Sequence, residues 1–196
     1  MFFEPAKNDH RLPYNPIKAC VVPRPIGWIS TVNKAGDVNV APFSFFNVLS
    51  YHPPYVLFSA GGHAEDQKEK DSVANVRATG EFVYNMATWD QREQMNNTGL
   101  IVDRTVDEMA ETGLEPLPSS LVAPPRIKGA PVHLECKLHE IVDLPGHDAM
   151  SSHHAVFGVV VGVHIFGDDD LTCPHCENRP PFRRRLPRAR PRPSSA

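Results

Sequence analysis

The stretch of sequence that decides the fold runs from residue 23 to residue 47 and reads PRPIGWISTVNKAGDVNVAPFSFFN. Its residues 28–32 are rich in β-branched and aromatic side chains, and Gly36-Asp37 before residues 38–41 is typical of a tight turn. The stretch therefore predicts a β-hairpin. After the hairpin the chain reaches a serine set between aromatic residues and an asparagine, a suitable cradle for a ligand that is flat at one end and anionic at the other.

Five further segments have the length and composition of strands. They are residues 19–22, 55–59, 81–87, 132–139 and 155–166. The fourth alternates apolar residues with two histidines, a glutamate and a lysine, which is typical of a strand with one face in water. The fifth is apolar on both faces, which is typical of a strand in a core or at a subunit contact.

Three short helices are expected, at residues 71–79, 90–97 and 108–111. Asp71 or Ser72 can cap the first helix, which Gly80 ends, and Asp90 can cap the second. The proline-rich stretch 116–125 is expected to be a loop. Because strands dominate and helices are brief, the sequence predicts a mainly β protein with short helices, built as a small β-barrel.

Length and composition set limits on the class of protein. The chain has 196 residues, 41% hydrophobic and 22% charged, which is ordinary for one globular domain. No window approaches the run of about 20 apolar residues that a membrane helix needs. The N-terminus has no signal-peptide pattern, and the four cysteines suggest no disulfide framework. We therefore expect a reduced, cytoplasmic protein without a membrane partner.

The last residues differ from the rest, and we place a boundary between a domain at 1–170 and a tail at 171–196. Residues 178–196 hold seven of the 20 Lys+Arg and none of the 23 Asp+Glu, so the remainder carries 13 minus 23, or −10. A body so acidic argues against nucleic acid as a partner. The tail, rich in arginine and proline, is expected to be disordered, and its alternative role is an arm for anionic partners.

The tail also contains Cys173-Pro174-His175-Cys176. A CxxC of this kind occurs in dithiol oxidoreductases and in zinc sites. The βαβ context of the first is absent, and the second lacks another pair, because Cys20 and Cys136 each stand alone in predicted strands. The favoured interpretation is therefore that the pair has no role, and no metal site is expected.

Four segments, in order and spacing, carry a resemblance to a known family. They read RPIGWIST at 24–31, NVAPFSFFNVLSYHPPYVLFSA at 39–60, KDSVANVRATGEFVYNMA at 70–87 and APVHLECKLHEIVD at 130–143. The chain resembles the flavin reductase-like family of FMN-binding split barrels over roughly residues 10–165. The family includes flavoredoxins and the reductase components of two-component monooxygenases.

The resemblance implies an FMN-binding split β-barrel that forms a homodimer and oxidises NADH or NADPH. Electrons would pass to free flavin, to a partner monooxygenase or to another acceptor. Hydride moves from the nicotinamide C4 to the flavin N5, and the cofactor supplies this reactivity. No catalytic acid or base is therefore expected from the side chains.

Eight residues of the matching segments are predicted to bind FMN. They are Arg24, Trp28, Thr31, Ser44, Asn47, Ser59, Lys70 and Ser72. Hydroxyls and amides suit the ribityl chain, two cations suit the phosphate, and the tryptophan, placed at a strand start or bulge, suits the flat ring. The serine at residue 72 also lies near a predicted helix N-terminus, which favours an anion.

Each of these residues has a plainer alternative. Trp28 is equally suited to the core, and serines of this kind commonly stabilise turns. The two cations would otherwise be solvated or form surface ion pairs. His153 and His154 are candidates for contact with the nicotinamide or the flavin ring, but exposed loop histidines are the favoured interpretation.

Two other functions remain open at this point. One is a flavin-holding electron carrier with no nicotinamide activity of its own. The other is a non-catalytic relic that cannot hold FMN. Members of the family normally continue with an Arg-Leu-Gly-Gly-like motif and a tyrosine that pack near the flavin, and this chain departs from that pattern. Our hypothesis is that a frame slip, or an annotation error, replaced the natural ending and with it one wall of the site.

Overall fold

The computed structural model describes residues 2–7, 10–14, 16–62, 69–100, 107–148 and 151–166. The predicted tail at 171–196, with its two cysteines, lies outside these ranges. Within them, no helix is long and apolar enough to cross a membrane.

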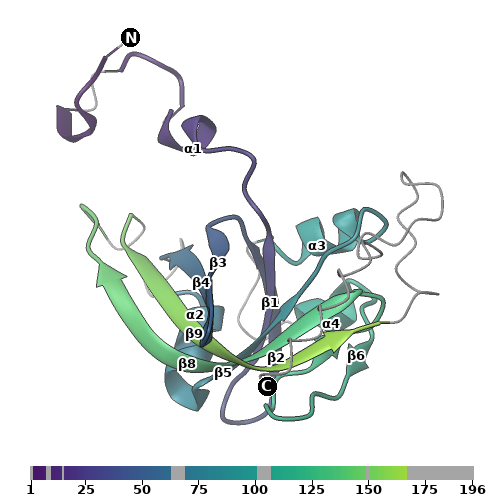
Figure 1. Ribbon diagram of the computed structural model, residues 1–196. Coiled ribbons are helices and arrows are strands. Elements are labelled where there is room, and N and C mark those ends of the chain that lie inside the picture. Colours follow the sequence, from purple (N-terminus) through teal and green to yellow (C-terminus); the bar gives the residue numbers. More distant parts are fainter. Residues whose placement is uncertain are drawn as a thin grey trace, which may run out of the picture.

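The architecture is a curved antiparallel sheet of seven strands in the order β2-β1-β5-β8-β9-β4-β3 (Figure 1). The strands are β1 Gly27–Val32, β2 Val38–Phe43, β3 Phe46–Tyr51, β4 Pro54–Gly61, β5 Glu81–Asn85, β8 Val132–Leu144 and β9 His153–Ile165. A small second sheet pairs β6 Pro116–Leu117 with β7 Arg126–Ile127. The helices are η1 Pro5–Lys7, α1 Ile17–Cys20, α2 Asp71–Thr79, α3 Arg92–Asn97 and α4 Glu108–Glu111. The mainly β prediction is confirmed.

The chain passes directly from one edge of the sheet to the other. Strands β2 and β3 are the two edges, and only Ser44 and Phe45 separate them in the sequence. The sheet must therefore curl until its edges approach each other. Pro42 lies in the edge strand β2, where the missing N–H of proline is tolerated.

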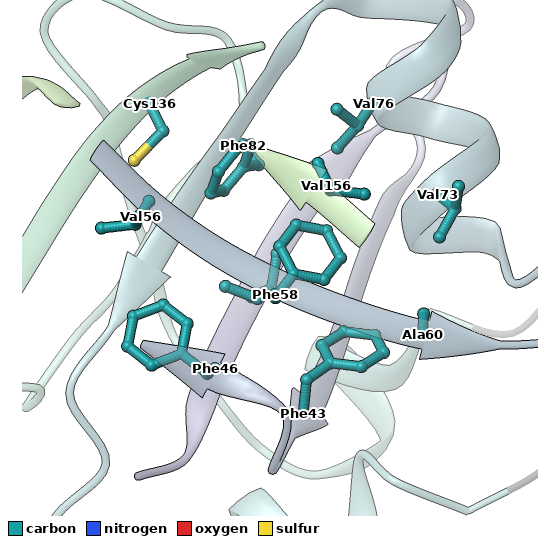
Figure 2. Packing of buried hydrophobic residues seen from close by; sticks show 11 residues of the cluster. Phe43, Phe46, Val56, Phe58, Ala60, Val73, Val76, Phe82, Cys136 and Val156 are labelled. Carbon is teal, nitrogen blue, oxygen red and sulfur yellow. The ribbon is translucent and has the colours of Figure 1, made fainter. Parts of the chain in front are cut away.

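The curled sheet encloses an aromatic core centred on Phe58 (Figure 2). Its ring lies 5.0 Å from the ring of Phe43 and 5.3 Å from that of Phe82. Gly158 faces this cluster, and a Cβ there would lie 2.4 Å from the Phe82 ring. A second core cluster joins β1 and β2 to α4 and comprises Trp28, Val40, Met109, Leu114 and Ile127.

The expected hairpin is present as β1 and β2, with Val32 opposite Val38. The expected helix at 71–79 is α2, and Gly80 ends it in the left-handed conformation with φ 76°. The helix at 108–111 is α4, which Asp107 caps through bonds from two backbone N–H groups. These elements were predictable because their turn, end and length signals are local in the sequence.

Three predicted details are wrong. Residues 19–22 form no strand, because Pro16 begins the short helix α1 and accepts the backbone N–H of Cys20 at 3.0 Å. The helix caps are Lys70 and Gln91, neither with a side-chain cap bond, rather than Asp71, Ser72 or Asp90. The stretch 116–125 is not all loop, since its first two residues pair with Arg126–Ile127.

The prediction that one face of β8 is open to water is also wrong for the first residues of the strand. His133 and Glu135 are fully buried because the segment 119–127 covers them. This segment is held by Glu135, which accepts the N–H of Ser120 at 2.8 Å, and by Asn85, which accepts the N–H of Ile127 at 2.8 Å. Only the later residues of the strand stay open to water.

A bulge changes the predicted alternation of β9. Glu135 pairs with Gly162 and Cys136 pairs with Val160, so Val161 has no partner. Residues after the bulge therefore exchange faces. Val163 pairs with Leu134, which packs on the aromatic core, and so it shares the face of Val160 instead of that of Val159.

Candidate functional site

Arg24 and Ser44 meet at the connection between β2 and β3. The Arg24 Nε donates to Ser44 Oγ at 3.3 Å, and its guanidinium carbon lies 5.7 Å from the centre of the Phe45 ring. A second guanidinium nitrogen donates to the backbone oxygens of Val21, at 3.1 Å, and Lys18. The arginine is thus fixed between the helical lead-in and the barrel, beside an aromatic ring that is 38% exposed.

Ser59 and His153 extend this group from the neighbouring strands. The Ser59 N–H donates to the Phe45 oxygen at 2.8 Å, and Ser59 Oγ lies 3.5 Å from His153 Nδ1. The rings of Phe45 and His153 are 5.8 Å apart. Burial, with the nearby charges of Lys18 and His154, lowers the pKa of His153. Both adjacent histidines lie in β9, so the favoured loop interpretation is wrong.

Lys70 belongs to a second group at the N-terminus of α2, where it is the cap residue. Its ammonium has no hydrogen-bond or ion-pair partner within the described ranges. It lines a small cavity of about 50 Å³ together with Asn39, Ala41, Pro42, Asp71, Ser72, Thr98, Gly99, Leu100 and Glu108. A cavity of this size holds a few waters.

Ser72 and Thr31 are buried, and their hydroxyls are used by the protein itself. Ser72 Oγ donates to Asn39 Oδ1 at 2.7 Å, and Thr31 Oγ1 accepts from Asn75 Nδ2 at 3.1 Å. These bonds fasten α2 to β1 and β2. Direct contact of these two hydroxyls with a ligand stays a prediction.

The half-buried carboxylate of Glu108 also lines this cavity, and no pattern in the sequence pointed to it. Glu108 accepts from Asn39 Nδ2 at 2.7 Å and from the Val40 N–H at 3.3 Å. Burial raises its pKa, against the effect of these bonds. The free edge of β2, which needs an acceptor there, becomes visible only when the sheet order is known.

Two predicted residues do not join either group. Trp28 is fully buried in the second core cluster, and its Nε1 donates to Thr98 Oγ1 at 3.0 Å. It is therefore a core aromatic, the alternative considered for it. Asn47 is exposed on the edge strand β3, and its side chain accepts only the N–H of Val48, at 2.9 Å, within the described residues.

The two groups flank the end of β4. Ser59 lies on that strand, and a bridge between Gly62 and Glu69 brings the residue before Lys70 beside the strand end. Arg24, Ser44 and Ser59 thus offer one set of polar groups and Lys70 another. Together they could hold an elongated ligand with an anionic end and a flat end.

Residues 19–178 match the family described as "Flavin reductase like domain". An uncharacterized protein of Aquifex aeolicus is 41% identical over 165 residues, which cover 84% of this chain and 81% of that protein.

Two solved structures are similar in both fold and sequence. Nitrilotriacetate monooxygenase component B from Bacillus cereus has a TM-score of 0.78 and 25% identity, covering 89% of this chain and 84% of that one. The 2-nitrobenzoate 2-nitroreductase of Pseudomonas fluorescens has a TM-score of 0.73 and 27% identity, covering 91% and 82%.

Proposed function

The chain belongs to the flavin reductase-like family, a split-barrel family of flavin-related oxidoreductases, and we propose that it binds FMN and takes hydride from NADH or NADPH. The observation that carries the proposal is the presence of two polar positions around the end of β4: the Lys70 ammonium, which has no partner among the described residues, and the group of Arg24, Ser44 and Ser59. A phosphate at one end and a flat ring at the other suit these two positions.

The residues present fit the cofactor in their chemistry. Lys70 supplies a cation at the N-terminus of α2, where the helix dipole also favours an anion. The cavity beside it is too small for the cofactor, so FMN would lie on the open surface at the strand end. The carboxylates of Asp71 and Glu108 line the cavity and keep the anion on the lysine's outer side.

Phe45 is the aromatic residue that this surface offers to a flat ring. It is 38% exposed, with Arg24 and His153 both beside its ring. When bound, FMN would accept hydride at its N5. The protein's share is to hold the flavin and nicotinamide rings together, and the hydride transfer itself needs no proton from a side chain.

The electron acceptor is proposed to be free flavin or a partner monooxygenase. The structural neighbour from Bacillus cereus is a monooxygenase component B, which favours the second acceptor.

We also propose a homodimer. Val163 and Ile165 are 58% and 62% exposed on one face of β9, an apolar pair suited to a subunit contact.

The test is a visible absorption spectrum of the purified chain before and after addition of FMN, followed by NADH or NADPH. Uptake of FMN with rapid bleaching by a nicotinamide supports the reductase. Bleaching by a protein donor alone would show a flavin-holding carrier. A colourless protein that takes up no FMN would be the relic, and would end the proposal.

The Lys70→Gln variant tests whether Lys70 binds the phosphate of FMN. A hydrogen bond to a charged group contributes about 1.5–3 kcal/mol, so we expect FMN affinity to fall by about tenfold or more. Lys34→Gln is the control, because Lys34 is an exposed residue in the turn between β1 and β2. Equal affinities of the two variants would place the phosphate elsewhere.

A further inference from the structure

His133 and His164 form a cross-strand pair on the covered face of β8 and β9, away from the end of β4. They are direct partners in the register, so their side chains project from the same face. Their ring centres are 6.2 Å apart, with planes at 79°. The proposed flavin site does not use either residue.

The His133 ring is fully buried, and only one of its two nitrogens makes a hydrogen bond within the described residues. Its Nε2 donates to the Ile127 oxygen at 2.9 Å, which leaves Nδ1 with a lone pair. That Nδ1 is buried and has no hydrogen-bond partner among the residues that the structure describes. Burial lowers the pKa of His133, so a proton is not expected to fill the position.

His164 is oriented in the same manner by a carboxylate. Its Nε2 donates to Glu135 Oε1 at 2.5 Å, and Glu135 also accepts the backbone N–H of Ser120 at 2.8 Å and of Leu121 at 2.6 Å. Burial alone would raise the pKa of Glu135, but these bonds lower it. The carboxylate is therefore charged and fully engaged, and His164 keeps its own Nδ1 for another partner.

Gly162 lies beside this carboxylate. It is opposite Glu135 in the register, and a Cβ at its position would lie 3.4 Å from the Glu135 side chain, in ordinary van der Waals contact. The Glu135 side chain therefore packs on β9, where it reaches the ring of His164.

We propose that His133 and His164 bind a divalent transition-metal ion through their Nδ1 atoms. Metal-bound histidines usually donate their other ring nitrogen to a carboxylate or a backbone carbonyl, and this pair shows one of each. Imidazole nitrogens suit Zn²⁺, Ni²⁺ and Cu²⁺. Two ligating rings at a tetrahedral ion have centres about 5 Å apart, so the rings would approach by about 1 Å.

The site as described has two protein ligands. In the ranges that the structure describes, no group of three or more histidine, cysteine or acidic side chains is gathered around one point. Water or an added ligand would complete the coordination. The inference is independent of the flavin proposal, because metal binding is measured without FMN.

The experiment is titration of the chelator-treated full chain with Zn²⁺ by calorimetry, and with Co²⁺ by absorption. We expect one ion per chain, with affinity lowered about tenfold or more in His164→Gln and in His133→Gln. His147→Gln, at an exposed position, is the control and is expected to bind as the parent does. Circular dichroism shows whether the buried His133 variant folds, and His164→Gln carries the test if it does not.

The Cys173→Ser, Cys176→Ser double variant tests whether the cysteine pair of the tail binds the metal ion instead. Retained binding, and a Co²⁺ spectrum without a sulfur charge-transfer band, support the histidine site. No bound ion in the parent chain would overturn the proposal. So would binding that the cysteine variant loses and both histidine variants keep.

Discussion

Glu135→Gln removes the charge from the carboxylate that anchors the loop over β8. Three donors converge on this fully buried group, from Ser120, Leu121 and His164. The amide nitrogen of glutamine is itself a donor. In the variant it would therefore face one of these three donors, and that hydrogen bond would be lost. A hydrogen bond to a charged group contributes about 1.5–3 kcal/mol, and we expect the free energy of unfolding to fall by about that amount for the bond that is lost.

The measurement is urea unfolding followed by tryptophan fluorescence, since Trp28 is fully buried in the native protein. Glu81→Gln is the matched control. Its carboxylate accepts the Ala123 N–H of the same loop at 2.8 Å, but it is only partly buried. We expect a cost below about 1 kcal/mol there.

The pH dependence gives an independent check on the same residue. The pKa of Glu135 is lowered in the folded state, so its stabilisation is present above the ordinary glutamate pKa and is lost as pH falls through the folded value. The parent should lose stability across that window, and Glu135→Gln should lose less. A variant within about 1 kcal/mol of the parent, with the same pH slope, would refute the reasoning.

Three further predictions concern the core and the polar site. Gly158→Ala places a methyl group 2.4 Å from the Phe82 ring and should cost about 1–3 kcal/mol of unfolding free energy, read from urea midpoints. Cys136 is buried with a raised pKa, so a thiol reagent followed by peptide mapping should label the exposed Cys20 in the native chain and Cys136 only after unfolding. The pKa of His153 is lowered by burial, so its stabilisation is lost as pH falls through the folded value, and His153→Gln should flatten the stability profile there.

The sequence predicted those parts of the fold whose signals are local. The turn at Gly36 and the end of α2 at Gly80 are each set by a residue with positive φ, and both were found. The helix α1 was missed because apolar Val21 and Val22 after it suggested a strand, although both are exposed.

The residues of the candidate site were named from motifs and not from periodicity, and their contact with a ligand stays a prediction. The group of Arg24, Ser44 and Ser59 comes from three segments that meet through the Arg24–Ser44 bond and the backbone bond from Ser59 to Phe45. Trp28 was predicted to face a ligand, but the bond to Thr98, 70 residues away, holds it in the core. Such distant partners leave no trace in the spacing of a single sequence.

The unpaired Val161 connects two features that the sequence presents as unrelated. An unbroken β9 would keep His164 on the face of Val160, in the aromatic core, and Val163 on the opposite face. The bulge reverses both placements. His164 therefore reaches the buried carboxylate of Glu135, while Val163 and Ile165 emerge as an exposed apolar pair. Pairing Val161 into the ladder would exchange the faces and destroy the histidine pair and the apolar pair together, whereas deleting it would leave Gly162 opposite Glu135 and both pairs in place.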